Sequence, residues 1–289
     1  MARQNLVFLY GAVANKPLIY KKEDGDYIYG LAIINVVRGV RDVGDHKRHM
    51  KCDNPYIMSR DPLILKEMES WEQYDMVEVK GMIAAKTIRK GSICTGCGEK
   101  NVAEGAFVYV EPIFAMRRGH CEDLDACMKE LSKNREISNQ AYVFGTLCKN
   151  PERMSPMSGL VLTQYQIALN RKYRIRSDPP EIRTDYPWVK SYGANAEEDA
   201  TRLHVGSTVF VDGCLQARSV NRHAVCSKCG KKYDWKDRAM EIVPYETEYV
   251  SNFYTDEQLS AQKAEKLEKA KKENFGFLST FDDEEDEEV

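Results

Sequence analysis

Two Cys-x-x-Cys pairs are the residues of this chain best suited to chemistry. Each pair places two thiols on one tight turn, and a glycine follows directly in both cases. One pair supplies only two of the four ligands that zinc usually takes in a structural site. A complete zinc site therefore requires both pairs to meet, within one chain or across two chains. The four ligands would be Cys94, Cys97, Cys226 and Cys229. Reduced or reversibly oxidised thiols are the alternative.

The other cysteines do not indicate a disulfide scaffold. The chain has nine cysteines in 289 residues, which is an odd number and a low density. The N-terminus lacks the charged-then-apolar layout of a secretory signal, so thiols or metal ligands are favoured over disulfides. No apolar stretch reaches the roughly 18 residues of a membrane span. We therefore expect a cytoplasmic protein without a membrane segment.

A second candidate site is a run of cations that encloses an aromatic ring. Its members are Arg171, Lys172, Tyr173, Arg174 and Arg176. Proteins that bind single strands without sequence preference combine cations along the phosphate backbone with flat rings on which bases stack. The alternative is that the ring fills a core or packs at an interface.

The elements that must position these residues occur twice. The cysteine pairs lie 132 residues apart, and other motifs recur near the same offset. The segment 75–81 parallels 207–213, and both end in glycine; 110–112 parallels 242–244, and both end in proline. Matches that keep one register over a hundred residues predict an internal duplication.

Each copy is predicted to be mostly β. Alternating apolar runs predict strands near 5–13, 27–37, 55–60, 76–84 and 105–114, and again near 140–147, 161–172, 187–192, 207–216 and 238–244. Asp61 and Pro62 predict a helix over 62–72, and Asn195 with Glu198 predicts one over 196–204. Five strands with a helix between the third and fourth is the order of an OB barrel. The expected fold is all-β, with two tandem OB barrels whose cysteine pairs lie between strands four and five.

The remaining segments divide the chain into four parts. We expect a first barrel over 1–118, a linker with a short helix over 119–138, a second barrel over 139–250 and a charged tail over 251–289. Thr255 with Gln258 has the spacing that opens a helix, whereas seven acids among the last eight residues cannot fold alone. From Asp256 onward there are 12 acidic and 5 basic side chains, a balance of −7. Because the net charge of the whole chain is −3, the residues before Asp256 carry a balance of +4. This asymmetry suits a basic body that binds a polyanion and an acidic tail that competes with the polyanion for the same surface. The alternative is a tail that only keeps the protein soluble.

The second copy resembles the bacterial single-stranded DNA-binding protein family. The motifs that carry the resemblance keep their order along nearly the whole copy: Phe144-Gly145-Thr146-Leu147, Gln166-Ile167-Ala168-Leu169-Asn170-Arg171-Lys172-Tyr173, Thr184-Asp185-Tyr186-Pro187-Trp188, Tyr192-Gly193 and Gly206 to Gly213. The resemblance implies that Tyr173, Tyr186 and Tyr192 stack on bases, and the two-residue spacing would put Trp188 on the face of Tyr186. It also implies a bacterial cytoplasm or nucleoid, a homo-oligomer, and replication or repair partners that bind the acidic tail.

Copy one is expected to be the weaker surface. Asn54 and Arg60 occupy the positions that match Tyr186 and Tyr192. Phosphate contacts could come from Arg38, Arg41, Lys47 and Arg48, with Tyr56 as a platform, and arginines such as Arg60 can also stack on bases. The alternative for the basic run is a solvated loop.

The motifs favour a non-catalytic protein. His120 and Glu122 form an H-x-E element of the kind used by zinc deaminases, but the nearest following pair begins 104 residues later, after Val225 where proline is usual. We therefore expect sequence-tolerant binding of single-stranded DNA in replication, recombination or the DNA metabolism of a phage or mobile element, with structural zinc. A replication-complex interaction protein and an RNA-binding OB protein are the alternatives, because stacking does not report the 2′-hydroxyl.

Overall fold

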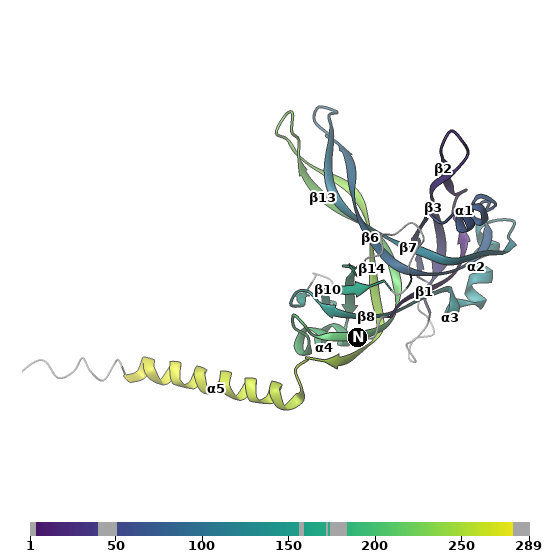
Figure 1. Ribbon diagram of the computed structural model, residues 1–289. Helices are drawn as coiled ribbons and strands as arrows, with labels where there is room; N and C mark the ends of the chain where they lie inside the picture. The colour runs from purple at the N-terminus through teal and green to yellow at the C-terminus, as the bar shows by residue number, and fades with distance from the viewer. Residues whose placement is uncertain (1–3, 40–50, 156–158, 172, 174–183, 280–289) are drawn as a thin grey trace, which may run out of the picture.

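The computed structural model describes residues 4–39, 51–155, 159–171, 173 and 184–279, which fold mainly into strands (Figure 1). Side chains alternate between buried and partly exposed along β1 and β8, as expected for strands that bury one face. The elements are β1 (Asn5–Val13), β2 (Leu18–Lys21), β3 (Tyr27–Val37), β4 (Cys52–Asp53), β5 (Tyr56–Ser59), α1 (Pro62–Glu69), β6 (Asp75–Ile93), β7 (Lys100–His120), α2 (Leu124–Lys133), α3 (Arg135–Ser138), β8 (Asn139–Leu147), β9 (Glu152–Met154), β10 (Leu162–Asn170), β11 (Thr184–Asp185), β12 (Trp188–Tyr192), α4 (Ala194–Arg202), β13 (Thr208–Val225), β14 (Lys232–Ser251) and α5 (Asp256–Ser279).

The two copies form two closed barrels of the same topology. In copy one the strand order is β1-β6-β7-β5-β3, and pairing of β1 with β3 closes the barrel. In copy two the order is β8-β13-β14-β12-β10, and pairing of β8 with β10 closes it. Helices α1 and α4 each lie between the third and fourth of these strands in the chain. The predicted all-β fold of two tandem OB barrels is confirmed for the described residues, and the short strands β2, β4, β9 and β11 were not predicted.

One prediction about helix ends is right and one is wrong. The Asp61 side chain accepts from the Leu63 backbone N–H at 2.9 Å, and Pro62 opens α1 as predicted. In copy two, α4 begins at Ala194 and not after a cap at Asn195. Gly193 has a φ of 63°, a left-handed conformation that glycine adopts at low cost, so the chain turns into the helix two residues earlier than predicted.

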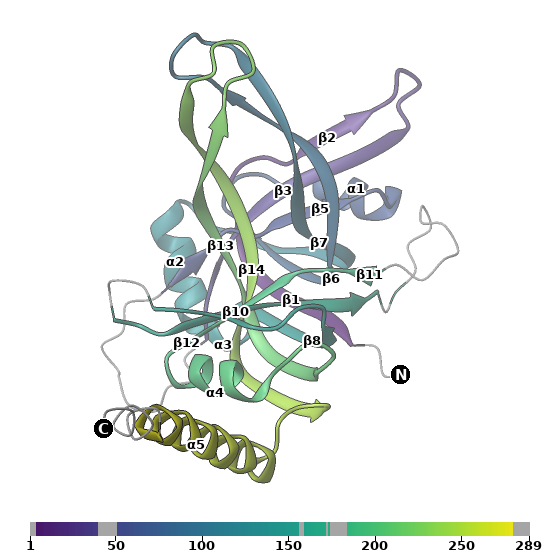
Figure 2. The same cartoon turned by 90° about the vertical axis from the view of Figure 1, so that its left-hand side faces the viewer.

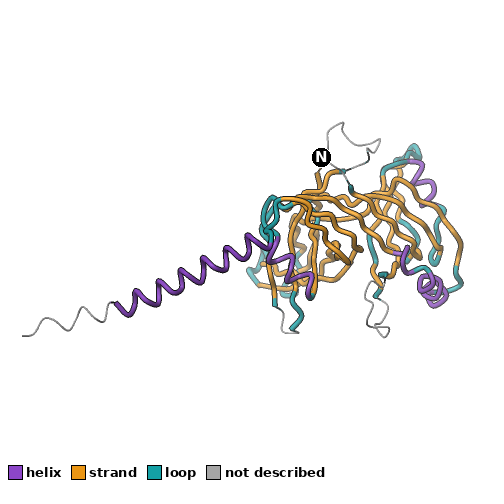
Figure 3. The backbone as a smooth tube through the Cα atoms, turned by 90° about the horizontal axis from the view of Figure 1, so that it is seen from below, coloured by secondary structure: helices purple, strands orange, loops and turns teal. Residues whose placement is uncertain are grey.

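The barrels join edge to edge through their first strands. β1 and β8 pair antiparallel from Asn5 opposite Val143 to Leu9 opposite Asn139. The pairing makes one continuous sheet through both copies, and buried side chains of both copies form a single core. Figure 3 shows the two barrels side by side. The position of one copy relative to the other is therefore set by backbone hydrogen bonds and shared apolar burial.

The hairpins between strands four and five extend far beyond the barrels. β6 pairs with β7 as far as Ile93 opposite Lys100, and β13 pairs with β14 as far as Val225 opposite Lys232. Figures 1 and 2 show both hairpins rising from the same side of the body and lying beside one another. We call the outer parts of the two hairpins, residues 86–107 and 217–238, the arm. The strands over 76–84, 105–114, 207–216 and 238–244 were thus predicted too short.

The linker and the C-terminal segment each contain a predicted helix. Asp123 accepts from the Ala126 backbone N–H at 2.8 Å and starts α2. The Thr255 N–H donates to the Gln258 side chain at 2.9 Å, and the Gln258 N–H donates to the Thr255 hydroxyl oxygen at 3.4 Å, so both bonds of the predicted capping box are present. Helix α5 then leaves the body (Figures 1 and 3). The acidic residues 282–288 lie outside the described residues. None of the described helices has the length and apolar character needed to span a membrane.

A buried carboxyl group under α4 makes stability depend on pH. Asp199 is completely buried, and the Tyr249 hydroxyl donates to it at 2.9 Å. Burial raises its pKa from 3.8 to about 6, so the folded protein holds an additional proton between those values. The group therefore destabilises the fold as pH rises through about 4–6.

We expect Asp199→Asn to gain stability relative to the natural protein as pH rises from 4 to 7. The gain should reach about 1–3 kcal/mol, because one pKa unit corresponds to about 1.4 kcal/mol. Urea unfolding at both pH values measures this difference, with Asp24→Asn in an exposed turn as the control. A difference that does not change with pH would contradict the assignment.

Candidate functional site

The two cysteine pairs meet at the tip of the arm. The Sγ atoms of Cys94 and Cys229 lie 3.7 Å apart, and those of Cys97 and Cys226 lie 3.6 Å apart. All four sulfurs lie within 4.8 Å of one another. The sequence left open whether the pairs meet within one chain or across two chains, and in the structure they meet within one chain.

Each pair sits on the same kind of turn. The Gly98 N–H donates to the Cys94 carbonyl at 2.9 Å, and the Gly230 N–H donates to the Cys226 carbonyl at 3.0 Å. Both glycines have positive φ angles, 72° and 68°, which fold each turn back towards its sulfurs. The Gly96 N–H donates to the Cys94 sulfur at 3.3 Å. The glycine after each pair, noted in the sequence, thus shapes the turn.

The spacing of the sulfurs fits a tetrahedral metal ion. Zinc–sulfur bonds are about 2.3 Å long, so two sulfurs of a regular tetrahedron lie about 3.8 Å apart. The Cys94–Cys229 and Cys97–Cys226 sulfur separations come within a few tenths of an ångström of this value. Four thiols without oxygen or nitrogen ligands suit a soft, tetrahedral ion. The cluster could therefore hold a metal ion.

Hydrogen bonds prepare one of these thiols for ionisation. Backbone hydrogen bonds from Cys229 and Lys228 lower the pKa of the Cys226 thiol to about 6, against the effect of burial. The Asn101 amide also donates to this sulfur at 3.7 Å. A backbone hydrogen bond at Glu99 lowers the pKa of the Cys97 thiol, but the neighbouring sulfurs and burial raise it to about 12. Of these two thiols, the surroundings therefore favour only Cys226 as the thiolate, which is the form that binds metal.

Contacts between the hairpins hold the cluster together. Asn101 of copy one accepts from the backbone N–H and the hydroxyl of Ser227, at 3.0 and 2.9 Å. Farther from the tip, Lys90 contacts Asp237 at 2.8 Å, and both side chains are largely buried. The arm is therefore one packed unit of two hairpins.

The predicted rings of copy two lie in different surroundings. Tyr186 is half exposed and lies in the gap between β11 and β12. Because it is not in a strand, the two-residue alternation of side chains does not place it on the same face as Trp188. Trp188 is partly buried, with the Lys149 ammonium 5.8 Å from its ring. Tyr192 is also partly buried, and its hydroxyl contacts Gln216 at 3.2 Å. Tyr173 is partly buried.

Two predicted phosphate contacts are used inside the fold. Arg171 donates to Asp185 at 2.7 and 3.0 Å and contacts Glu111 of copy one at 3.4 Å. Its side chain is only 6% exposed. Burial alone would lower the pKa of Arg171, but the Asp185 carboxylate raises it above its usual value. This placement argues against a direct contact of Arg171 with DNA.

Arg38 repeats this arrangement in copy one. It donates to Asp53 at 2.6 and 3.0 Å, and its side chain is 15% exposed. Asp53 also accepts a hydrogen bond from the Ala217 backbone N–H of copy two at 3.1 Å. In the same way, Asp185 of copy two accepts a hydrogen bond from a backbone N–H of copy one at 2.8 Å. The matched arginine–aspartate pairs therefore link the copies. The other predicted cations of these runs, Arg41, Lys47, Arg48, Lys172, Arg174 and Arg176, lie outside the described residues.

Copy one gathers, around the predicted platform Tyr56, further rings that the sequence did not indicate. Tyr20 and Tyr29 stack at 4.4 Å between ring centroids, and Phe107 lies 5.2 Å from Tyr56. Buried Tyr109 supports Phe107 at 5.4 Å, which is a stacked arrangement. The two-residue spacing of Phe107 and Tyr109 in one strand was the available signal, because it places both on one face.

A cation lies among these rings. The Lys86 ammonium is 5.8–5.9 Å from the ring centroids of Tyr29, Phe107 and Tyr109. Burial and the nearby charge of exposed Arg60 lower its pKa. From copy two, Arg238 lies 5.1 Å from the ring of Tyr56. We call the partly exposed rings with this lysine the ring surface: Tyr20, Tyr29, Tyr56, Phe107 and Lys86.

Comparisons with known proteins agree with the fold and the motifs. The model of the Single-strand binding protein family matches residues 138–229, which run from the start of the second barrel to its cysteine pair. A crystal structure of the single-stranded DNA binding protein from Thermus aquaticus has a TM-score of 0.53 at 16% identity, covering 88% of this chain and 97% of that one. At this identity the likeness concerns the fold alone, and it extends over both barrels.

Two relatives match in sequence. A single-stranded DNA-binding protein of Aquifex aeolicus is 31% identical over 77 residues, which is 27% of this chain and 52% of the relative, so the match spans about half of that protein. Single-stranded DNA-binding protein B of Bacillus subtilis is 32% identical over 81 residues, which is 28% of this chain and 70% of the relative. The resemblance inferred from the motifs is therefore confirmed, and the chain belongs to the single-strand binding protein family.

Proposed function

We propose that the chain binds single-stranded DNA without strong sequence preference and without catalysis. The ring surface carries the proposal, because it combines partly exposed rings with a lysine among them. Such a surface accepts any base, since every base has a π-face, while cations neutralise the phosphates. The names of the relatives support the same class of ligand. Replication, recombination or the DNA metabolism of a phage or mobile element is the proposed setting.

The proposed path includes residues of both copies. Copy one contributes the ring surface and Arg60, and copy two contributes Tyr173, Tyr186, Trp188 and Tyr192. Arg238 of copy two already faces Tyr56 of copy one, so a strand could pass between the copies on a continuous surface. Duplex DNA keeps its bases stacked inside, which leaves these rings without a partner. Single strands should therefore bind better than duplex DNA.

We also propose that the four cysteines hold one structural zinc ion per chain. Zinc supplies no chemistry at such a closed four-sulfur site, but it contributes folding free energy. Cys94, Cys97, Cys226 and Cys229 would each give one thiolate, and the ion would join the tips of the two hairpins. The arm would then keep its shape under thermal motion.

A titration of labelled oligo-dT, oligo-rU and duplex DNA at several salt concentrations tests the DNA-binding proposal. Affinity for oligo-dT should exceed that for duplex DNA and fall with salt, with a slope of about −0.7 per phosphate contact. Tyr29→Ala and Phe107→Ala should each weaken binding by about 1–3 kcal/mol, roughly 5–150-fold.

Phe253→Ala is the matched control, because this partly buried ring packs against Tyr249 of copy two and lies outside the ring surface. It should leave the affinity within about twofold. Folded ring variants that bind oligo-dT like the natural protein would refute the stacking surface. Preference for oligo-rU would reassign the ligand to RNA.

A further inference from the structure

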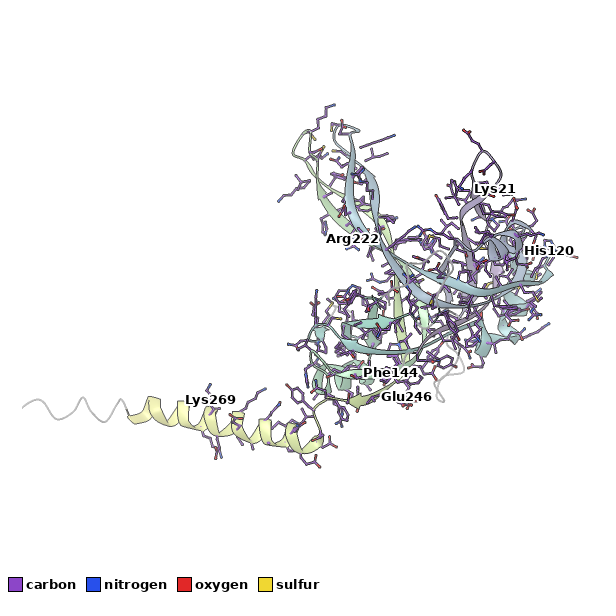
Figure 4. All side chains as sticks on the ribbon, in the orientation of Figure 1. Lys21, His120, Phe144, Arg222, Glu246 and Lys269 are labelled. Carbon is purple, nitrogen blue, oxygen red and sulfur yellow. The ribbon has the colours of Figure 1, made fainter. Side chains whose placement is uncertain are left out.

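The arm differs from the rest of the chain in charge. Its 44 residues contain 11 basic and 4 acidic side chains, a balance of +7 in a protein of net charge −3. Seven of the basic side chains are exposed, against the two exposed carboxylates Glu104 and Asp234; they are Arg89, Lys100, Arg222, Lys228, Lys231, Lys232 and Lys236. Figure 4 shows Arg222 on the arm, away from both barrels. A surface of this sign attracts polyanions.

The rings of the arm are turned inward. Tyr233 is 5% exposed, and its hydroxyl contacts Ser92 of the other hairpin at 2.7 Å. Trp235 is partly buried and packs against the cluster that contains Cys94 and Cys226. Beyond Phe107 at the root, the outer faces of the described arm therefore present cations without a large ring for base stacking. This composition suits a nucleic acid whose backbone, and not its bases, is recognised.

The shape of the arm fits a duplex. A two-stranded β-ribbon is an element that the major groove of B-DNA admits. The hairpins are such ribbons, and their mutual contacts, including Lys90 with Asp237, hold them in a preformed arrangement. Near the tip, the apolar side chains Ile93, Val102 and Val225 are each 61–62% exposed. Apolar side chains in the major groove can contact the methyl groups of thymine.

We propose that the arm is a second nucleic-acid site, which holds duplex DNA next to the single strand. The inference rests on the proposed function, because the ring surface at the root of the arm would hold the adjoining single strand. Lys86 and Phe107 belong to both surfaces, so the two sites are continuous. Duplex DNA carries one charge per about 1.7 Å and releases more counterions per contact than a single strand, so a surface of cations alone favours it. The preferred ligand is a junction of single and double strands.

Binding of three labelled ligands tests this proposal: oligo-dT, a blunt duplex, and the same duplex with the dT strand as a tail. The natural protein should bind the tailed duplex roughly tenfold more tightly than oligo-dT, the order expected from two or three additional phosphate contacts. The triple variant Lys100→Glu, Lys232→Glu, Lys236→Glu should lose this advantage and keep its affinity for oligo-dT within about twofold.

A control with the same change in charge is Lys66→Glu, Lys129→Glu, Lys263→Glu, on exposed faces of α1, α2 and α5. It should retain the advantage. The zinc content of the arm variant reports whether its tip is intact.

If the natural protein binds the tailed duplex no better than oligo-dT, the proposal is overturned. It is also overturned if the arm variant loses affinity for both ligands equally, which would make the arm part of the single-strand path. If the natural protein does not bind oligo-dT at all, the proposed function fails, and this result is distinct from failure of the arm proposal.

Discussion

Cys226→Ser and Cys94→Ser proteins are each expected to lose most of their zinc, whereas the natural protein should hold close to one ion per chain. Four sulfurs within 4.8 Å provide a complete tetrahedral set, and three thiolates hold the ion less well than four. Elemental analysis of protein prepared without added metal is the measurement. Cys148→Ser is the control, because Cys148 is a partly buried cysteine outside the cluster, and it should retain the ion.

The barrels should survive the loss of metal. Each barrel closes through its own backbone pairing, and the shared core does not include the cysteine cluster. Circular dichroism should therefore show folded β-structure in both serine variants, while limited proteolysis should cut the arm more readily. Zinc content near zero in the natural protein, with all four thiols freely reactive, would refute the metal centre.

Arg171→Ala is expected to lower the free energy of unfolding by about 3–5 kcal/mol, the usual cost of removing one partner of a buried ion pair. The arginine is 6% exposed and contacts two carboxylates, so its loss leaves Asp185 and Glu111 without their shared cation. Urea unfolding measures the change. Arg153→Ala, which removes an exposed contact to Glu197, should cost less than about 1 kcal/mol.

Binding data from the same Arg171 variant separate its structural role from a DNA contact. Measured well below the unfolding transition, its affinity for oligo-dT should stay within about twofold, and the salt dependence should not change. A salt slope that falls by about 0.7 at unchanged stability would identify a phosphate contact and contradict the structural role.

Local patterns predicted most of the barrel elements because those signals act over a few residues. Asp61 and Pro62 mark the start of α1, and the alternation of apolar residues marks β1 and β8. The start of α4 was misplaced because the positive φ of Gly193 competes with the capping-box spacing at Asn195. The lengths of β6, β7, β13 and β14 were underestimated, because the arm strands are polar on the outside and lack a clear apolar alternation.

Candidate residues were harder to predict than elements. The interleaved run from Arg171 suggested phosphate contacts, but the structure turns this arginine towards Asp185 and Glu111. Charge at a position says nothing about which way the side chain points, and a buried carboxylate from the other copy cannot be seen in the sequence. For the same reason the sequence did not indicate the rings that gather in copy one from β2, β3, β5 and β7.

The sequence by itself determined the duplication, the five-strand order of each copy and the two cysteine pairs at matched positions, because each depends on patterns within short segments or on one offset. Only the tertiary structure decided that the pairs meet in one chain, at sulfur separations of 3.6 and 3.7 Å. That meeting follows from the antiparallel pairing of β1 with β8, which places the two hairpins side by side. Contacts between residues more than a hundred positions apart depend on how the copies are placed, and no local pattern encodes that placement.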